Sequence, residues 1–68
     1  MRITDEGGTS HRSIYVALTD DEAAELRDGL DALLREGQGL HWHVADAKFQ
    51  TELTIYRADD PTVAPPFA

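Results

Sequence analysis

TDDEAAELRDGLDALLREG, residues 19–37, is the stretch of sequence that decides the fold. Plotted at about 100° per residue, its leucines and Ala23 fall within one narrow arc, which is typical of a helix with one buried face. Thr19 and Glu22 have the spacing of a capping box, in which two side chains satisfy backbone N–H groups at a helix start. Gly37 can adopt the left-handed conformation that ends a helix. The sequence therefore predicts an amphipathic helix between Thr19 and Gly37.

Three segments around this helix have the composition of strands. Residues 13–18 alternate between the two faces, as a half-buried strand does, and residues 40–45 and 49–57 form two further strands joined by a short turn. A strand, a helix and a second strand normally make a right-handed crossover. We therefore expect an α+β domain of β-α-β-β layout, with a three-stranded, mainly antiparallel sheet of order 1-3-2 covered on one face by a single helix.

The short turn predicts a register for the last two strands. The expected pairs are Val44 with Phe49, Trp42 with Thr51, Leu40 with Leu53, His43 with Gln50 and His41 with Glu52. A slip by one residue would bury the histidines and expose Trp42, so the apolar pattern favours this pairing. The expected core consists of Ile14, Val16, Leu18, Leu26, Leu30, Leu33, Leu34, Leu40, Trp42, Val44, Phe49, Leu53 and Ile55.

Chain length limits what this core can do. The 68 residues make one domain, which we divide into an N-terminal arm at 1–12 with a candidate extra strand, the β-α-β-β domain at 13–57 and a proline-rich tail at 58–68. A chain of this size is near the lower limit at which a single core is stable alone. We therefore expect a homo-oligomer.

Charge and cysteine content limit the classes of partner and the cellular location that we expect. Thirteen acidic and six basic residues give a net charge of −7, which repels phosphate backbones and anionic membranes. No apolar run reaches the roughly 20 residues of a membrane span, and residues 1–8 lack the apolar region of a signal peptide. The sequence contains no cysteine, which suits a reducing compartment. We expect a cytoplasmic protein that binds neither nucleic acid nor membrane.

The sheet face opposite the helix is the main candidate site. In the expected sheet, this face gathers histidines, tyrosines and polar side chains, which suit a protein-binding or assembly surface. The candidate interface residues are Tyr15, His41, His43, Glu52, Thr54 and Tyr56.

Two alternative binding functions remain open. His41 and His43, with Glu52 across the strand pair, form a two-histidine, one-carboxylate set of the kind that binds zinc or ferrous iron in a metal- or small-ligand-binding homo-oligomer. The outer helix surface instead suits an acidic inhibitor or immunity-type protein that binds a basic partner, although local pairing with arginines also explains it as a solvated face. Its acidic residues are Asp21, Glu25, Asp28 and Asp31.

Catalysis and cofactor binding have less support. The chain has no glycine-rich phosphate loop and no cysteine nucleophile, so we do not expect an enzyme, nor a bound cofactor. The β-α-β-β order with Trp42 on the second strand is similar in outline to the dodecins, which hold flavin between tryptophans. Here, however, Trp42-His43-Val44 is followed almost at once by a turn. Trp42 also shares its strand face with Leu40 and Val44, which predicts a place in the core.

Overall fold

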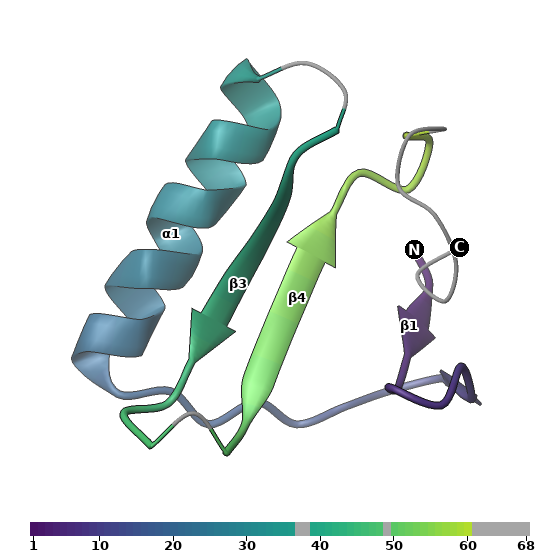
Figure 1. Cartoon of the computed structure of the whole chain (residues 1–68), viewed down its shortest axis with the longest axis horizontal. Coiled ribbons are helices and arrows are strands. Elements are labelled where there is room, and N and C mark those ends of the chain that lie inside the picture. The colour runs from purple at the N-terminus through teal and green to yellow at the C-terminus, as the bar shows by residue number, and fades with distance from the viewer. Residues whose placement is uncertain (37–38, 49, 61–68) are drawn as a thin grey trace.

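The computed structural model of the chain describes residues 1–36, 39–48 and 50–60. Its elements are β1 (Ile3–Thr4), β2 (Ser10–His11), α1 (Asp20–Arg35), β3 (His41–Ala45) and β4 (Glu52–Tyr56). β1 pairs with β2 and β3 pairs with β4, both antiparallel. The described chain thus has an α+β arrangement of one helix and two separate two-stranded sheets (Figure 1).

The helix and its capping box are confirmed. The backbone N–H of Glu22 donates to Thr19 Oγ1 at 3.2 Å, and that of Thr19 donates to Glu22 Oε1 at 2.9 Å. Three acidic residues in the first turn and Arg35 in the last complement the helix dipole. The helix ends where Glu36 turns to an extended conformation while its N–H still reaches the carbonyl of Ala32. The expected stop at Gly37 lies outside the described residues.

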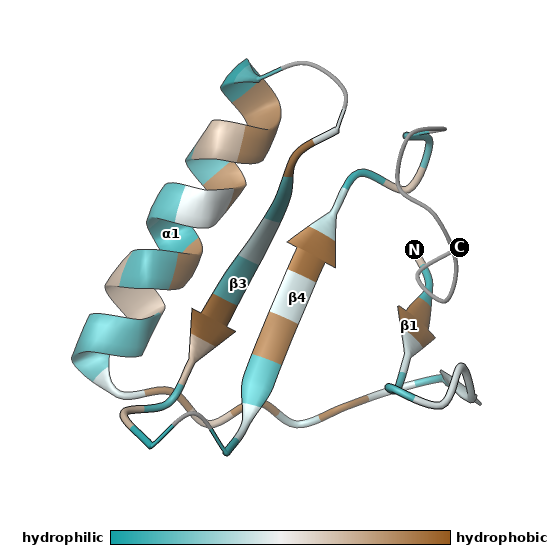
Figure 2. Cartoon of the chain, in the orientation of Figure 1, coloured by the Kyte–Doolittle hydropathy of each residue, from teal (hydrophilic) through white to brown (hydrophobic). Residues whose placement is uncertain are grey.

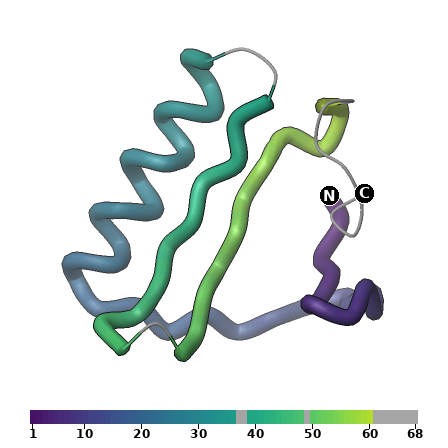
Figure 3. The backbone as a smooth tube through the Cα atoms, in the orientation of Figure 1, coloured from purple at the N-terminus to yellow at the C-terminus, as the bar shows by residue number. Residues whose placement is uncertain are grey.

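The expected three-stranded sheet of order 1-3-2 is wrong. Residues 13–18 form no strand, and no backbone–backbone hydrogen bond involves them in the described part of the chain. Figures 1 and 3 show this segment running across the loop end of the β3–β4 hairpin before it enters α1. A segment that crosses the strands cannot extend their ladder, so its alternating pattern does not make it a strand here.

The register of the β3–β4 hairpin also differs from the expected one. Val44 pairs with Leu53 and Trp42 with Ile55, a shift of four residues along β4. Asp46 sets the longer loop, because its N–H donates to the Thr51 carbonyl at 3.1 Å and its Oδ1 accepts from the N–H of Gln50 at 2.8 Å. Since four is even, every side chain keeps its expected face, and Figure 2 shows hydrophobic residues alternating along both strands.

The core is smaller than expected. Among the described residues, the buried apolar side chains are Ala32, Leu33 and Val44. The side chains of Ile14, Val16, Leu18, Leu30 and Leu34, all placed in the core by the sequence pattern, are exposed. The cause is geometric: α1 lies mainly over β3, and in the described chain no strand other than β3 pairs with β4 (Figure 1). Phe49, also expected in the core, lies outside the described residues.

Close contact between Gly29 and Trp42 explains the position of the helix. Gly29 is buried, and a Cβ atom there would lie 2.6 Å from Cγ and 2.7 Å from Nε1 of the Trp42 ring. Only glycine leaves room for the indole at this point. The buried face of α1 is therefore centred on Gly29 and Leu33, and Leu30 and Leu34 are turned toward solvent.

Asp5 organises the N-terminal hairpin of β1 and β2. Its Oδ1 accepts from the N–H groups of Gly7 at 2.9 Å and Thr9 at 3.0 Å, and its Oδ2 lies 3.0 Å from His11 Nε2. Gly8 takes the positive φ of 86° that the turn requires. The hydrogen bond from His11, followed by that from Thr9, lowers the pKa of Asp5 below its ordinary value of 3.8.

The two ends of the described chain meet the rest at a few polar contacts. Arg2 Nη2 donates to the Ala58 carbonyl at 3.2 Å, and Asp60 Oδ2 accepts from the N–H of Gly39 at 2.6 Å. The expected tail at 58–68 lies outside the described residues from 61 onward. No helix in the described ranges has both the length and the apolar character needed to cross a membrane.

Replacing Gly29 with alanine should destabilise the protein by about 1–3 kcal/mol, because the new methyl group must displace the Trp42 ring. Helix propensity alone predicts the opposite, a gain of about 1 kcal/mol. The measurement is urea unfolding followed by tryptophan fluorescence, with Asp28→Ala on the exposed helix surface as the matched control. A Gly29→Ala protein as stable as that control would contradict the proposed packing.

The Asp5 turn should open in acid. Because its folded pKa is lowered, the Asp5 carboxylate stabilises the hairpin above pH 3.8, and this contribution is lost as the pH falls through the folded pKa. The NMR amide shifts of Gly7 and Thr9 should therefore move together below that pH. Asp5→Asn should show the acid-like shifts at pH 6. Unchanged Gly7 and Thr9 shifts in that variant would exclude this role.

Candidate functional site

The β3–β4 hairpin has one face under α1 and one open face. We call the latter the open face and define it by the exposed or half-buried side chains His41, His43, Glu52, Thr54 and Tyr56. Odd-numbered residues of β3 and even-numbered residues of β4 share this face because side chains alternate along a strand. It therefore retains five of the six predicted interface residues.

A hydrogen-bonded cluster occupies the centre of the open face. His43 Nδ1 lies 3.0 Å from Glu52 Oε1 and 2.8 Å from Thr54 Oγ1, and the Thr54 hydroxyl donates to the same carboxylate oxygen at 3.3 Å. Thr54 is directly opposite His43, and Glu52 reaches it diagonally. Three side chains from two strands thus hold one another in place at a solvent-exposed surface.

His41 extends this cluster toward the other end of the hairpin. Its ring meets the His43 ring edge to face, with centroids 4.9 Å apart and planes at 86°. Tyr56 is directly opposite His41 in the ladder. Aromatic rings and a polar triad therefore follow one another along the open face.

The corrected fold changes the neighbours of two predicted site residues. Tyr15 is fully exposed on the segment before α1, outside the β3–β4 sheet, because residues 13–18 form no strand of it. Glu52 is opposite Ala45, not His41, because of the four-residue register shift. The sequence pattern correctly predicted that the other five residues share one face of the hairpin. It was wrong to place Tyr15 on that face and to pair Glu52 with His41.

The proposed metal ligands do not converge in this geometry. Glu52 and His41 lie on opposite sides of His43 along the hairpin. Within residues 1–36, 39–48 and 50–60, no three histidine or carboxylate side chains are grouped so that they could hold a metal ion.

The acidic helix surface is partly neutralised by arginines. Arg27 Nε lies 3.2 Å from Asp28 Oδ1, and Arg35 Nε lies 3.2 Å from Asp31 Oδ2. Asp21 and Glu25 are also exposed, and Asp21 belongs to the acidic first turn that complements the helix dipole. Local pairing and the helix dipole thus explain most of this acidic surface without a partner.

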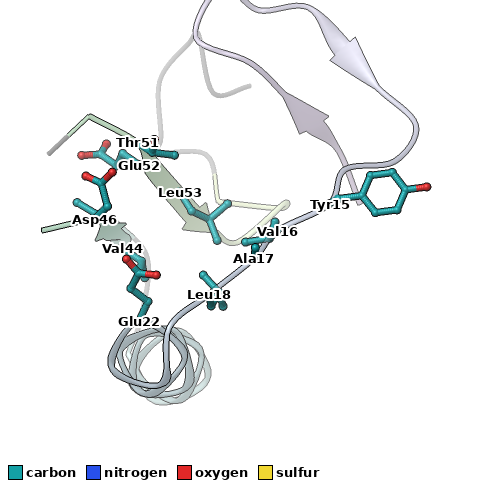
Figure 4. Close-up of a pocket in the computed structure, with 11 residues that line it drawn as sticks. Tyr15, Val16, Ala17, Leu18, Glu22, Val44, Asp46, Thr51, Glu52 and Leu53 are labelled. Carbon is teal, nitrogen blue, oxygen red and sulfur yellow. The ribbon is translucent and has the colours of Figure 1, made fainter. Parts of the chain in front are cut away.

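The sequence pattern did not predict a groove on the helix side of the hairpin. Residues 15–18 form one wall, and Glu22 and the loop end of the hairpin form the rest. Figure 4 shows Leu53 directed toward Val16 and Ala17, whereas the ring of Tyr15 points away. Only the crossing path of residues 13–18 creates this groove, so no local sequence signal predicts it.

Comparison with known proteins gives no further guide to the site, since no family model, no curated protein and no solved structure matches this chain.

The two carboxylate-bound histidines should have opposite neutral tautomers. An ionised carboxylate only accepts hydrogen bonds, so His43 must carry its proton on Nδ1 and His11 on Nε2. A long-range ¹⁵N–¹H NMR spectrum at pH 8 would show both patterns at once. Glu52→Gln should relax the preference at His43 and leave His11 unchanged. An Nε2-protonated His43 in the unmodified protein would contradict the hydrogen-bonded cluster.

Proposed function

We propose that this chain is a small protein-binding module that acts through the open face of its β3–β4 hairpin. The observation that carries the proposal is the His43–Glu52–Thr54 cluster, which is exposed yet already ordered by its own hydrogen bonds. Side chains that are held before binding lose less conformational entropy when a partner docks.

The composition of the open face supports a protein partner. Aromatic residues are enriched at protein interfaces, and this face combines Tyr56 with the edge-to-face rings of His41 and His43. Glu52 is the single carboxylate among the five defining residues, so this face lacks the excess of acid found on the helix.

We also propose that the protein is cytoplasmic and that it binds a partner without catalysing a reaction. Of the five residues that define the open face, Glu52 alone lines either of two hollows in the described structure; the first is lined by Leu30, Leu33, Leu34 and Arg57, and the second mainly by residues 15–18 and the loop end of the hairpin. This supports binding in preference to catalysis. The absence of cysteine from the sequence supports a cytoplasmic location.

Site-specific photo-crosslinking in the cells that naturally make this protein tests this function. A crosslinking residue at position 41 on the open face should yield a defined covalent complex with another protein, whereas one at position 28 on the outer helix surface should not. Purified partner should then bind His43→Ala at least about tenfold more weakly, a loss of 1.4 kcal/mol, because the substitution removes the centre of the cluster. Asp28→Ala is the control and should bind normally. Complexes from position 28 alone would favour the acidic-inhibitor function and overturn this one.

A further inference from the structure

The outer edge of β4 is the next feature that needs an explanation. In the described chain β4 pairs with β3 and with no other strand. The N–H of Asp46 donates to the carbonyl of Thr51, which makes this a hydrogen-bonded pair of the antiparallel ladder. Such pairs alternate with non-bonded ones, so Leu53 and Ile55 direct their backbone groups to β3, and Thr54 directs its N–H and C=O away from it. Neither group of Thr54 has a hydrogen-bond partner among the described residues.

The sequence of β4 is complementary to itself around Thr54. If two copies of Glu52–Tyr56 pair antiparallel with Thr54 opposite Thr54, Leu53 faces Ile55 of the other copy and Glu52 faces its Tyr56. Apolar residues then meet on the helix side, and no carboxylate opposes another. The two Thr54 residues exchange both backbone hydrogen bonds at the centre, as a two-fold axis requires.

The helix presents apolar surface on the same side. Leu30 is 49% and Leu34 86% exposed, and together with Leu33 and Arg57 they line a hollow of about 450 Å³ beside the end of β4. These two leucines therefore leave apolar surface in water. A second hairpin added to the edge of β4 would bring a second helix to this layer and cover part of that surface. The surface area buried by this contact would be small for a specific protein–protein interface.

We infer that two copies of this chain associate through the outer edges of their β4 strands, forming one four-stranded sheet with Leu30 and Leu34 packed across the junction. The two open faces lie on the same side of this sheet and stay uncovered. The dimer is therefore independent of the proposed function and would double its binding surface.

Charge makes this contact dependent on salt. Each copy carries a net charge of −7, so two copies repel each other and added salt weakens the repulsion. The dimer should therefore be tighter in 0.5 M than in 0.05 M sodium chloride. Attraction to a basic protein would show the opposite dependence.

Sedimentation equilibrium of the whole chain up to 0.2 mM tests the inference. Thr54→Pro removes an N–H that the β3–β4 ladder does not use, so the fold should persist while the dissociation constant of the dimer rises at least about tenfold. Leu34→Glu changes a side chain already in water and should weaken the dimer by a similar factor. Tyr15→Glu adds the same charge at another fully exposed site and should change the dissociation constant by less than about twofold.

Circular dichroism establishes which variants are folded. If Thr54→Pro does not fold, Leu34→Glu alone tests the contribution of this contact to the dimer. A monomer at 0.2 mM in 0.5 M salt would overturn the inference. A dimer that survives both substitutions, or that Tyr15→Glu alone dissociates, would overturn the assignment to the β4 edge. None of these results depends on the crosslinking at position 41.

Discussion

The contact of Trp42 with the backbone at Gly29 is the constraint on which the rest of the structure depends. The indole occupies the place where any other residue would carry a Cβ atom, so the helix approaches β3 closely at this point. That approach buries Leu33 and Val44 and leaves the apolar stripe of α1 only partly covered. The small core and the exposed helix leucines follow from a helix held over one strand of a hairpin that, in the described chain, has only two strands.

Local patterns predicted the elements whose causes are local. Thr19 and Glu22 cap the helix because their spacing alone brings donor and acceptor together. The alternation in β3 and β4 predicted their two faces for the same reason. Residues 13–18 have an equally good alternation but form no strand, because a strand also needs a neighbour whose direction matches, and that depends on tertiary structure.

For the candidate site, too, the sequence predicted the local feature, the shared face, but not the tertiary one, the pairing partners. Strand parity placed His41, His43 and Thr54 on one face, but the partner of each depends on the register. Asp46 sets that register by accepting a hydrogen bond from Gln50, an interaction that alternation does not encode. The pairing of His43 with Glu52 is consequently a property of the loop as much as of the strands.

The even register shift also bears on how this hairpin can change during evolution. Between Ala45 and Glu52 the chain has six residues, and Asp46 and Thr51 close the loop within them. Gain or loss of two residues there would preserve which side chains face the helix, whereas gain or loss of one would exchange the two faces of a strand. Descendants of this sequence should therefore vary in loop length mainly in steps of two, and a shorter loop would bring the hairpin toward the tighter pairing that its apolar pattern also allows.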